Sequence, residues 1–299
     1  NHKNIAAALQ LRLEEVVLRQ LKYAKKKFGY ENLCLAGGVA LNCSMNGKIE
    51  KSKIFKKIYI QPASADDGCS IGACYLAHFN SSKKLFKENK MYNSYLGSRF
   101  TKEEIEKEIK NFGIKVEKSR DIYKETSKLL NDGKIIAWFQ GASEFGPRAL
   151  GNRSILCKPS PASMKDHLNN NVKFREEFRP FAPAVLDKFK NDFFDIGQDS
   201  YHMLIATTVK KEKKNLIPAV VHIDNTCRVQ TVKREINKKF YDLIEEFYKL
   251  TNIPVLLNTS FNIKGQPMIN NPYEAIKTFI KTRIDVLVIG DFVIKKENL

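Results

Sequence analysis

Apolar residues recur at helical spacing at the start of the chain and then form short runs. Between residues 4 and 27 they recur about every four positions, which predicts an amphipathic helix that packs on a sheet. Its apolar positions are Ile5, Leu9, Leu13, Val17, Leu21 and Ala24. The run at 33–35 predicts a short buried strand and the run at 57–60 predicts a second strand, each followed by a turn and another helix. This alternation of helices and strands predicts an α/β arrangement.

A stretch rich in lysine and asparagine, residues 81–95, predicts a linker between two domains. We therefore place one domain at residues 1–90 and a second at residues 91–299. Thr101 and Glu104 have the spacing of a capping box, which predicts that the second domain begins with a helix.

Further apolar runs in the second domain have clear boundaries. Gly113 ends the helix that follows the capping box. The elements expected after it are a strand at 114–117, a helix at 122–132, a strand at 135–139, a helix from Asn271-Pro272 to Lys281, and a strand at 285–289. They predict an α/β domain with a twisted mixed sheet whose strand ends converge on one site.

Composition narrows the class of protein. The 299 residues are 43% hydrophobic, which is enough for two ordinary cores. No run approaches 18 consecutive apolar residues, and the first ten residues contain no apolar signal-peptide core, so we expect no membrane span. The six cysteines contain no CxxC pair, which favours reduced thiols. These features predict a cytoplasmic enzyme.

The net charge of +18 has two interpretations. Lysine runs at 25–27, near Lys56 and around Lys211 are typical of a solvated surface. A large positive charge is also typical of proteins that bind nucleic acids. This chain lacks a basic motif interleaved with aromatic residues, which disfavours nucleic acid as a partner. On either interpretation the positive field attracts anionic substrates.

Arginine is concentrated beside turn residues in two runs. FGPRALGNR contains Arg148 and Arg153, and VKFREEFRPFAP contains Lys173 and Arg179. A guanidinium offers a rigid fork of donors that binds two phosphate oxygens at once, and glycines let the main chain approach a ligand. With the polar run NTSFNIKGQP, which starts at Asn258, they predict a site for a polyphosphate or carboxylate-like anion. The alternative is that individual arginines pair with nearby acidic residues.

Four long motifs resemble the O-carbamoyltransferases of the nodulation and antibiotic-tailoring type. They are WFQGASEFGPRALGNRSIL, VKFREEFRPFAPAVL, HIDNTCRVQTV and LLNTSFNIKGQPMI. The resemblance implies that residues 1–90 are the second lobe of an actin-like ATPase domain, similar to the tRNA-threonylcarbamoyl transferase. Residues 91–299 would then be similar to the threonylcarbamoyl-AMP synthases.

The resemblance also implies a reaction. Carbamoyl phosphate and ATP, the latter with Mg²⁺, would give carbamoyl-adenylate and pyrophosphate, and the carbamoyl group would pass to a hydroxyl of a small-molecule or sugar acceptor. The implied catalytic residues are Arg148, Arg153, Lys173 and Arg179. The residues implied to complete the substrate pocket are Arg228, Asn258, Ser260 and Asn262. One departure is Gln266, where many relatives carry Glu.

The first domain carries only part of a transferase site. The resemblance implies that Asp66 binds iron or another divalent metal, although Asp66 is equally suited to cap the helix that follows. The residues implied to bind nucleotide are Gly37, Gly38, Val39 and Asn42. The paired-histidine motif of the family is missing from these 299 residues. We therefore expect the first lobe of this domain either upstream in the same full-length chain or on a separate subunit.

Two other classes of function stay open on the sequence. One is threonylcarbamoylation of tRNA, which uses the same two kinds of domain. A non-catalytic nucleotide-binding assembly subunit would account for the missing lobe. His222 is a further candidate base, with a structural pair to Asp224 as the alternative.

Overall fold

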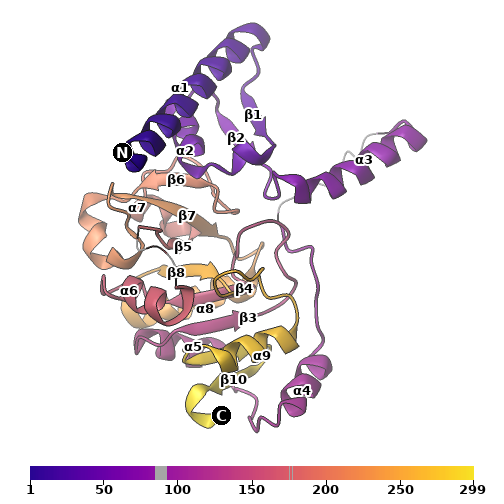
Figure 1. Cartoon of the computed structure of the whole chain (residues 1–299), viewed down its shortest axis with the longest axis vertical. Coiled ribbons are helices and arrows are strands. Elements are labelled where there is room, and N and C mark those ends of the chain that lie inside the picture. The colour runs from indigo at the N-terminus through magenta and orange to yellow at the C-terminus, as the bar shows by residue number, and fades with distance from the viewer. Residues whose placement is uncertain (85–92, 175, 177) are drawn as a thin grey trace.

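The first 84 residues form a lobe around a two-stranded sheet. The computed structural model describes residues 1–84, 93–174, 176 and 178–299 (Figure 1). In the lobe, β1 (Asn32–Leu35) and β2 (Lys57–Ile60) run parallel. Its helices are α1 (His2–Phe28), α2 (Cys43–Ser52) and α3 (Cys69–Ser82). The helix and the two strands predicted for this part of the chain are therefore confirmed as elements. The burial predicted for residues 33–35 is wrong, because β1 contains no buried residue in a sheet of only two strands.

The rest of the chain is built on an eight-stranded mixed sheet in the order β10-β9-β3-β4-β8-β5-β7-β6. Strands β3 to β6 span Ile136–Phe139, Arg153–Cys157, Ala182–Leu186 and Ile205–Thr208. Strands β7 to β10 span Thr226–Val232, Val255–Ser260, Val286–Ile289 and Phe292–Lys295. The pairs β3–β9 and β5–β7 are parallel, and the other neighbouring pairs are antiparallel. The mixed sheet predicted from the sequence is confirmed.

One face of this sheet is covered by α5 (Ile122–Asn131) and α8 (Lys238–Thr251). Side chains alternate along β3, so Ile136 and Trp138 point to this face and pack with Phe240 and Phe247 of α8. The fully buried Trp138 also donates from Nε1 to the carbonyl oxygen of Gly151 at 2.9 Å. The core therefore anchors the loop that connects β3 to β4.

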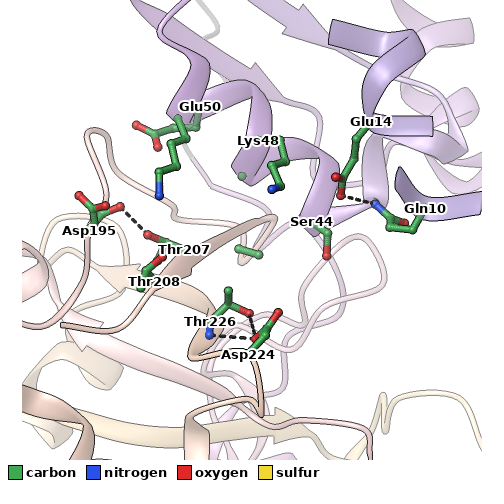
Figure 2. A pocket seen from close by; sticks show the side chains of 13 residues that line it. Gln10, Glu14, Ser44, Lys48, Glu50, Asp195, Thr207, Thr208, Asp224 and Thr226 are labelled. Carbon is green, nitrogen blue, oxygen red and sulfur yellow. Dashed lines mark hydrogen bonds between the residues drawn. The ribbon is translucent and has the colours of Figure 1, made fainter. Parts of the chain in front are cut away.

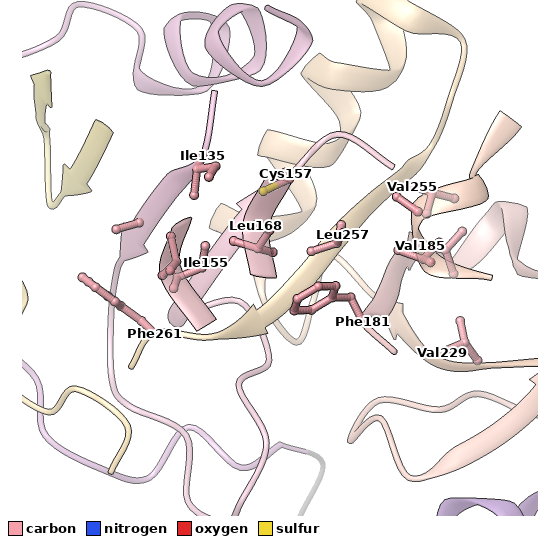
Figure 3. Close-up of a cluster of buried hydrophobic side chains, with 14 of the residues drawn as sticks. Ile135, Ile155, Cys157, Leu168, Phe181, Val185, Val229, Val255, Leu257 and Phe261 are labelled. Carbon is pink, nitrogen blue, oxygen red and sulfur yellow. The ribbon is translucent and has the colours of Figure 1, made fainter. Parts of the chain in front are cut away.

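The opposite face is covered by α4 (Lys102–Asn111), α6 (Met164–Leu168) and α9 (Pro272–Lys281). A short helix, α7 (Lys190–Phe193), lies between β5 and β6 along the chain. Ile155, Leu168 and Leu257 pack together on this side of the sheet (Figure 3). With both faces covered, the strand ends are the part of the sheet left to build a site.

Side-chain caps begin the helices as the sequence predicts. Thr101 Oγ1 accepts a hydrogen bond from Glu104 N at 3.2 Å, and Glu104 Oε2 accepts one from Thr101 N at 2.7 Å. These two bonds complete the predicted capping box. Asn271 caps α9 in the same way, through a bond of 2.8 Å from Glu274 N. Both predicted helix starts are confirmed.

The strand predicted at residues 114–117 is wrong. Ile114 N donates to Ile109 O at 3.2 Å and closes the end of α4 instead of joining a sheet. Beyond it, Lys118 forms an isolated antiparallel bridge with Phe292. A short apolar run does not by itself identify a strand, because its backbone N–H groups can instead bond to the last carbonyl oxygens of a preceding helix.

The N-terminal lobe packs closely against the edge strand β6. A Cβ atom on Gly47 of α2 would lie 2.0 Å from the carbonyl oxygen of Ala206, so the two backbones meet at a position that requires glycine. Asn46 Nδ2 donates to Leu204 O at 2.9 Å. Glu50 Oε1 accepts a bond from Gly197 N at 3.0 Å. These contacts fix the N-terminus of α2 beside the large sheet.

The linker predicted at residues 81–95 is described only at its two ends. Residues 81–82 belong to the last turn of α3. Residues 85–92, which contain the predicted domain boundary at residue 90, lie outside the described residues. Within the described part of the chain, no helix combines the length and apolar character needed to cross a membrane.

Candidate active site

The loop between β3 and β4 folds around a buried carboxylate. Glu144 Oε1 accepts hydrogen bonds from the backbone N–H groups of Leu150, Asn152 and Arg153 at 2.7, 2.8 and 3.2 Å. Burial raises the pKa of Glu144, and the backbone donors oppose that rise. Glu144 therefore holds the main chain of the loop rather than the side chain of an arginine.

Two glycines let this loop approach its neighbours. Gly146 has a φ of +117°, and a Cβ atom there would lie 2.7 Å from the carbonyl oxygen of Pro62 in the N-terminal lobe. Gly151 has a φ of +100°, and a Cβ atom there would lie 2.1 Å from the ring of Phe240. A residue with a side chain would be strained at these positive φ values, and its Cβ atom would clash with the neighbouring atoms. The loop thus lies against the lobe on one side and α8 on the other.

Arg153 is a buried structural residue of this loop. Its guanidinium is fully buried and donates to the carbonyl oxygens of Gln140, Gly141 and Ser98, at 2.6 to 3.2 Å. It also stacks on Phe139, with 3.7 Å between the guanidinium carbon and the ring centroid. Burial lowers the pKa of Arg153 to about 10, which leaves it charged near neutral pH. Because the N–H groups of this guanidinium donate to main-chain carbonyl oxygens, Arg153 holds the loop in position.

Arg148 and Arg228 lie together without an acid. Burial and the charge of Arg228 lower the pKa of Arg148 to about 10, and burial lowers that of Arg228. The Nε atoms of both are buried and have no hydrogen-bond partner. Neither side chain forms an ion pair with any described residue. The thiol of Cys43, the first residue of α2, hydrogen-bonds to Arg228. Two partly buried guanidinium groups without an acidic partner are stabilised when an anion binds beside them.

An amide network supports the position of Arg148. Asn258 Nδ2 donates to Ala149 O at 3.2 Å and to Gln230 Oε1 at 2.9 Å. Gln230 Nε2 donates in turn to Leu150 O at 2.9 Å. The Oδ1 atom of Asn258 is buried and accepts no hydrogen bond from the described residues. Gln230 was missed by the sequence analysis, although it lies two residues after Arg228 on the same strand.

Lys173, Ser260 and Asn262 form a second cluster at the end of β8. Lys173 Nζ donates to Asn262 Oδ1 at 2.8 Å and to Ser260 O at 2.5 Å. Ser260 Oγ donates to Asn262 Oδ1 at 2.7 Å. The backbone oxygen of Gln266 accepts a bond from Asn262 Nδ2, so this position contributes main chain rather than its side chain. Ser260 follows Asn258 by two positions on β8, which places the cluster about 7 Å along the strand from the amide network.

Arg179 is more exposed than these groups. Its side chain is 56% exposed, and its Nε lies 3.0 Å from Glu176 Oε2. Lys173, the other predicted residue of this run, is buried. An exposed ion pair is worth at most about 1 kcal/mol, so Arg179 is available to another anion.

His222 lies beside Arg228. Burial lowers the pKa of His222 to about 4, and the charge of Arg228 adds to that effect. The hydroxyl of Thr226 donates to Asp224 Oδ1 at 2.7 Å and lies 3.2 Å from His222 Nδ1. Thr226 thus lies between the histidine and the aspartate. The Nε2 atom of His222 is buried and has no partner in the described residues.

The transferase residues predicted in the first domain lie at an exposed edge. Gly37, Gly38, Val39 and Asp66 are all exposed, in turns that follow β1 and β2. Asn42 follows them as the cap of α2: its backbone N donates to Val39 O at 3.0 Å, and its Oδ1 accepts a bond from Met45 N at 3.0 Å. Among the described residues, no group of three or more His, Cys, Asp or Glu is arranged to hold a metal. The residues described here do not fit an iron site, so we derive no step through one.

The candidate anion site consists of two guanidinium groups, an amide network and a lysine cluster in the mixed-sheet domain, with Cys43 of the small lobe bonded to Arg228. The family model described as carbamoyltransferase N-terminus matches residues 1–75. The model described as carbamoyltransferase C-terminus matches residues 127–296. The chain belongs to the carbamoyltransferase family.

Relatives cover the chain almost completely. Nodulation protein NolNO of Sinorhizobium fredii is 42% identical over 99% of this chain and 44% of its own length. Nodulation protein NolO of Bradyrhizobium diazoefficiens is 40% identical over 99% of this chain and 55% of its own length. The chain spans about half the length of the curated relatives it matches. The family resemblance of the sequence motifs is confirmed.

A solved structure, full-length HypF in its phosphate- and nucleotide-bound form, matches with 20% identity and a TM-score of 0.43. The match covers 59% of this chain and 22% of HypF.

Proposed function

We propose that this chain forms carbamoyl-adenylate at the site of Arg148 and Arg228. The observation that carries the proposal is a pair of partly buried guanidinium groups, with buried Nε atoms, that have no acidic partner among the described residues. Two such charges repel each other until an anion binds between them. ATP and carbamoyl phosphate are anions whose phosphate oxygens match the guanidinium fork.

The balanced reaction consumes ATP, carbamoyl phosphate and water. Water cleaves the phosphorus–oxygen bond of carbamoyl phosphate, which releases inorganic phosphate and carbamate. A carbamate oxygen then forms a bond to the α-phosphorus of ATP, and the bond from that phosphorus to pyrophosphate breaks. Negative charge grows on the departing oxygens, where Arg148 and Arg228 stabilise it together with the Mg²⁺ that ATP carries.

We assign orientation of the carbamoyl group to the amide and hydroxyl side chains. A carbamoyl group offers two N–H donors and a carbonyl acceptor. The Oδ1 of Asn258 accepts from its amine, and the second N–H of Asn262 Nδ2 donates to its carbonyl or to a phosphate. The ammonium group of Lys173 holds Ser260 and Asn262 in place and contributes positive charge. Arg153 acts through the loop rather than on the substrate.

We assign transfer to a hydroxyl acceptor to a lobe that completes the first domain. A two-stranded parallel sheet is normally extended by further strands and covered on both faces. Here Cys34 and Tyr59 lie on the outer face of β1 and β2 and are exposed, and α3 has no buried residue although it is apolar. Its Leu76 is 60% exposed. We propose that this surface receives the first lobe, from the same full-length chain or from a separate subunit.

This division of labour gives a direct expectation for the 299 residues alone. They should catalyse exchange of labelled pyrophosphate into ATP that depends on carbamoyl phosphate, because the anion site lies within the described residues. They should not carbamoylate a hydroxyl acceptor, because the edge that carries Asp66 is incomplete. Radiolabel exchange and mass spectrometry of sugar acceptors measure the two activities.

The same assay separates the alternatives. Carbamoyl transfer by the 299 residues alone would contradict the assignment to a second lobe. No exchange in a folded protein would favour a non-catalytic nucleotide-binding subunit. Retention of tRNA on a filter, with carbamoyl-dependent modification, would favour the tRNA-modifying class.

Arg179 provides a test of the loop that follows Lys173. We expect Arg179→Lys to lower kcat/KM for exchange by about 30-fold, or about 2 kcal/mol, because a point charge cannot replace a fork that binds two oxygens. The free energy of unfolding should change by less than about 0.5 kcal/mol, since the side chain is exposed. The matched control is Glu176→Gln, which breaks the ion pair of Arg179 but should leave exchange intact. Unchanged kinetics in folded Arg179→Lys would remove this residue from the site.

A further inference from the structure

A polar pocket lies between the N-terminal lobe and the edge of the large sheet (Figure 2). It has a volume of about 430 Å³, which is in the range of small-molecule sites. Helices α1 and α2 form one wall. The other wall is formed by β6 and by the turn that precedes β7. None of the predicted site residues lines it.

The charges that line the pocket have the opposite sign to the chain as a whole. The lining contains the carboxylates of Glu14, Glu50, Asp195 and Asp224. The basic side chains are those of Lys48 and Lys51. Four carboxylates against two ammonium groups leave a formal excess of two negative charges, in a chain whose net charge is +18. Such a pocket favours a cationic occupant.

Glu14 is the carboxylate that most needs a partner. It is 8% exposed, and Figure 2 shows it pointing into the pocket. Its Oε1 accepts one bond from the neutral Gln10 Nε2, at 2.8 Å, and it forms no ion pair with any described residue. Glu50, equally buried, contrasts with it, because it is paired with Lys53 at 2.6 Å. A buried carboxylate with a single neutral donor is stabilised when a cation binds beside it.

The remaining lining groups are hydroxyls. Ser44, Thr208 and Thr226 contribute from α2, β6 and β7. Hydroxyls both donate and accept, which suits a ligand that carries hydroxyl groups of its own. We propose that this pocket is a second ligand site, for a small organic cation that bears several hydroxyl groups, such as a compound of amino-sugar size. Its amine pairs with Glu14, and its hydroxyls bind the opposite wall.

Hydrogen bonds connect this pocket to the anion site. Gln10 and Asn42 bond reciprocally, with Asn42 Nδ2 donating to Gln10 Oε1 at 2.7 Å and Gln10 Nε2 lying 3.2 Å from Asn42 Oδ1. Asn42 caps α2, whose first residue, Cys43, bonds to Arg228. A ligand that engages Glu14 therefore acts on groups that also hold Arg228. The proposal does not require the adenylate reaction, so either one can fail alone.

The test is calorimetric titration of the 299-residue chain with glucosamine, with glucose and spermidine as comparison probes. We expect saturable binding of glucosamine at one site, and binding at least about tenfold weaker for glucose, which lacks the charge, and for spermidine, which lacks the hydroxyls. Tighter binding of spermidine than of glucosamine would overturn the hydroxylated class. Absence of saturable glucosamine binding would overturn the site.

Two adjacent carboxylates on α1 provide a matched pair of variants. Glu14→Gln should weaken glucosamine binding at least about tenfold. Glu15→Gln should not, because Glu15 is exposed and paired with Arg12 at 3.1 Å. Equal affinity in both variants would contradict the proposal. Should Glu14→Gln fail to fold, Asp195→Asn at the exposed rim is the second variant, and unchanged binding in it would count against the site. Pyrophosphate titration of each sample reports the anion site independently.

Discussion

Replacing Arg228 by lysine should lower kcat/KM for carbamoyl phosphate-dependent pyrophosphate exchange by about 100-fold or more. The reason is the geometry of its neighbourhood: Arg228 and Arg148 lie together, each partly buried, and the buried Nε atoms of both lack partners. A lysine retains one positive charge but loses the fork and the Nε donor. Removal of one preorganised donor from a site of this kind costs about 2.7–4 kcal/mol of transition-state stabilisation. Steady-state exchange rates against ATP and carbamoyl phosphate measure the loss.

Stability measurements separate this role from a structural one. Removing one of two buried like charges should leave the anion-free protein at least as stable, so Arg228→Met should not lower the free energy of unfolding. It should abolish the stabilisation that pyrophosphate gives to the native chain. The matched control is Arg234→Lys, a half-exposed arginine paired with Asp242 at 3.0 Å, which should leave exchange unchanged. Destabilisation of Arg228→Met by several kcal/mol without ligand would show that Arg228 serves the fold.

For Arg153 we expect the opposite result, a large loss of stability from the same type of substitution. Arg153→Lys should lower the free energy of unfolding by about 3 kcal/mol or more. The guanidinium donates to two separate stretches of main chain, at Ser98 and at Gln140–Gly141, and stacks on Phe139, and a lysine reaches only part of these partners. The carbonyl oxygens left behind are buried without donors. Urea unfolding, followed by tryptophan fluorescence of the buried Trp138, measures the change.

An exposed arginine serves as the comparison. Arg12→Lys on α1 changes the same atoms, but its side chain is 67% exposed and makes a surface ion pair with Glu15, so the free energy of unfolding should change by less than about 0.5 kcal/mol. Equal stability of Arg153→Lys and Arg12→Lys would mean that the hydrogen bonds of Arg153 contribute little. In that case Arg153 would have to be assigned to substrate binding instead of to holding the loop.

Local signals predicted most of the elements. The helices at the start of each domain follow from apolar spacing and caps, and the strand that ends at Phe139 follows from its apolar run. The strand prediction for residues 114–117 failed because a run of four residues does not show whether a neighbouring strand is present to pair with it. The order of the eight strands could not be predicted either. Strand β8 lies between β4 and β5 in the sheet, although it follows both of them in the sequence.

The candidate site was predicted as a set of residues but not as a set of roles. Arg148 and Arg153 are five residues apart in one motif and have the same chemistry. Strand pairing separates them, because Arg153 begins β4 opposite Phe139 and is drawn into the core. Arg148 lies in the loop that Glu144 folds. No sequence pattern distinguishes a guanidinium that binds carbonyl oxygens from one that awaits an anion.

The pocket beside α1 could not be predicted for a related reason. Along the sequence Glu14 is one of many charged positions on an amphipathic helix, where a solvated carboxylate is the ordinary expectation. It becomes a buried group only because β6, almost two hundred residues later, closes the opposite wall.

The close approach of Gly47 to Ala206 bears on how the walls of the polar pocket can move. With one backbone resting on the other, α2 cannot slide or swing away from β6 without breaking its bonds to Leu204 and Gly197. The contact between α2 and β6 is therefore not a hinge. A ligand that enters the pocket between them meets walls of fixed separation, so its size is selected by the fold itself and not by closure around it.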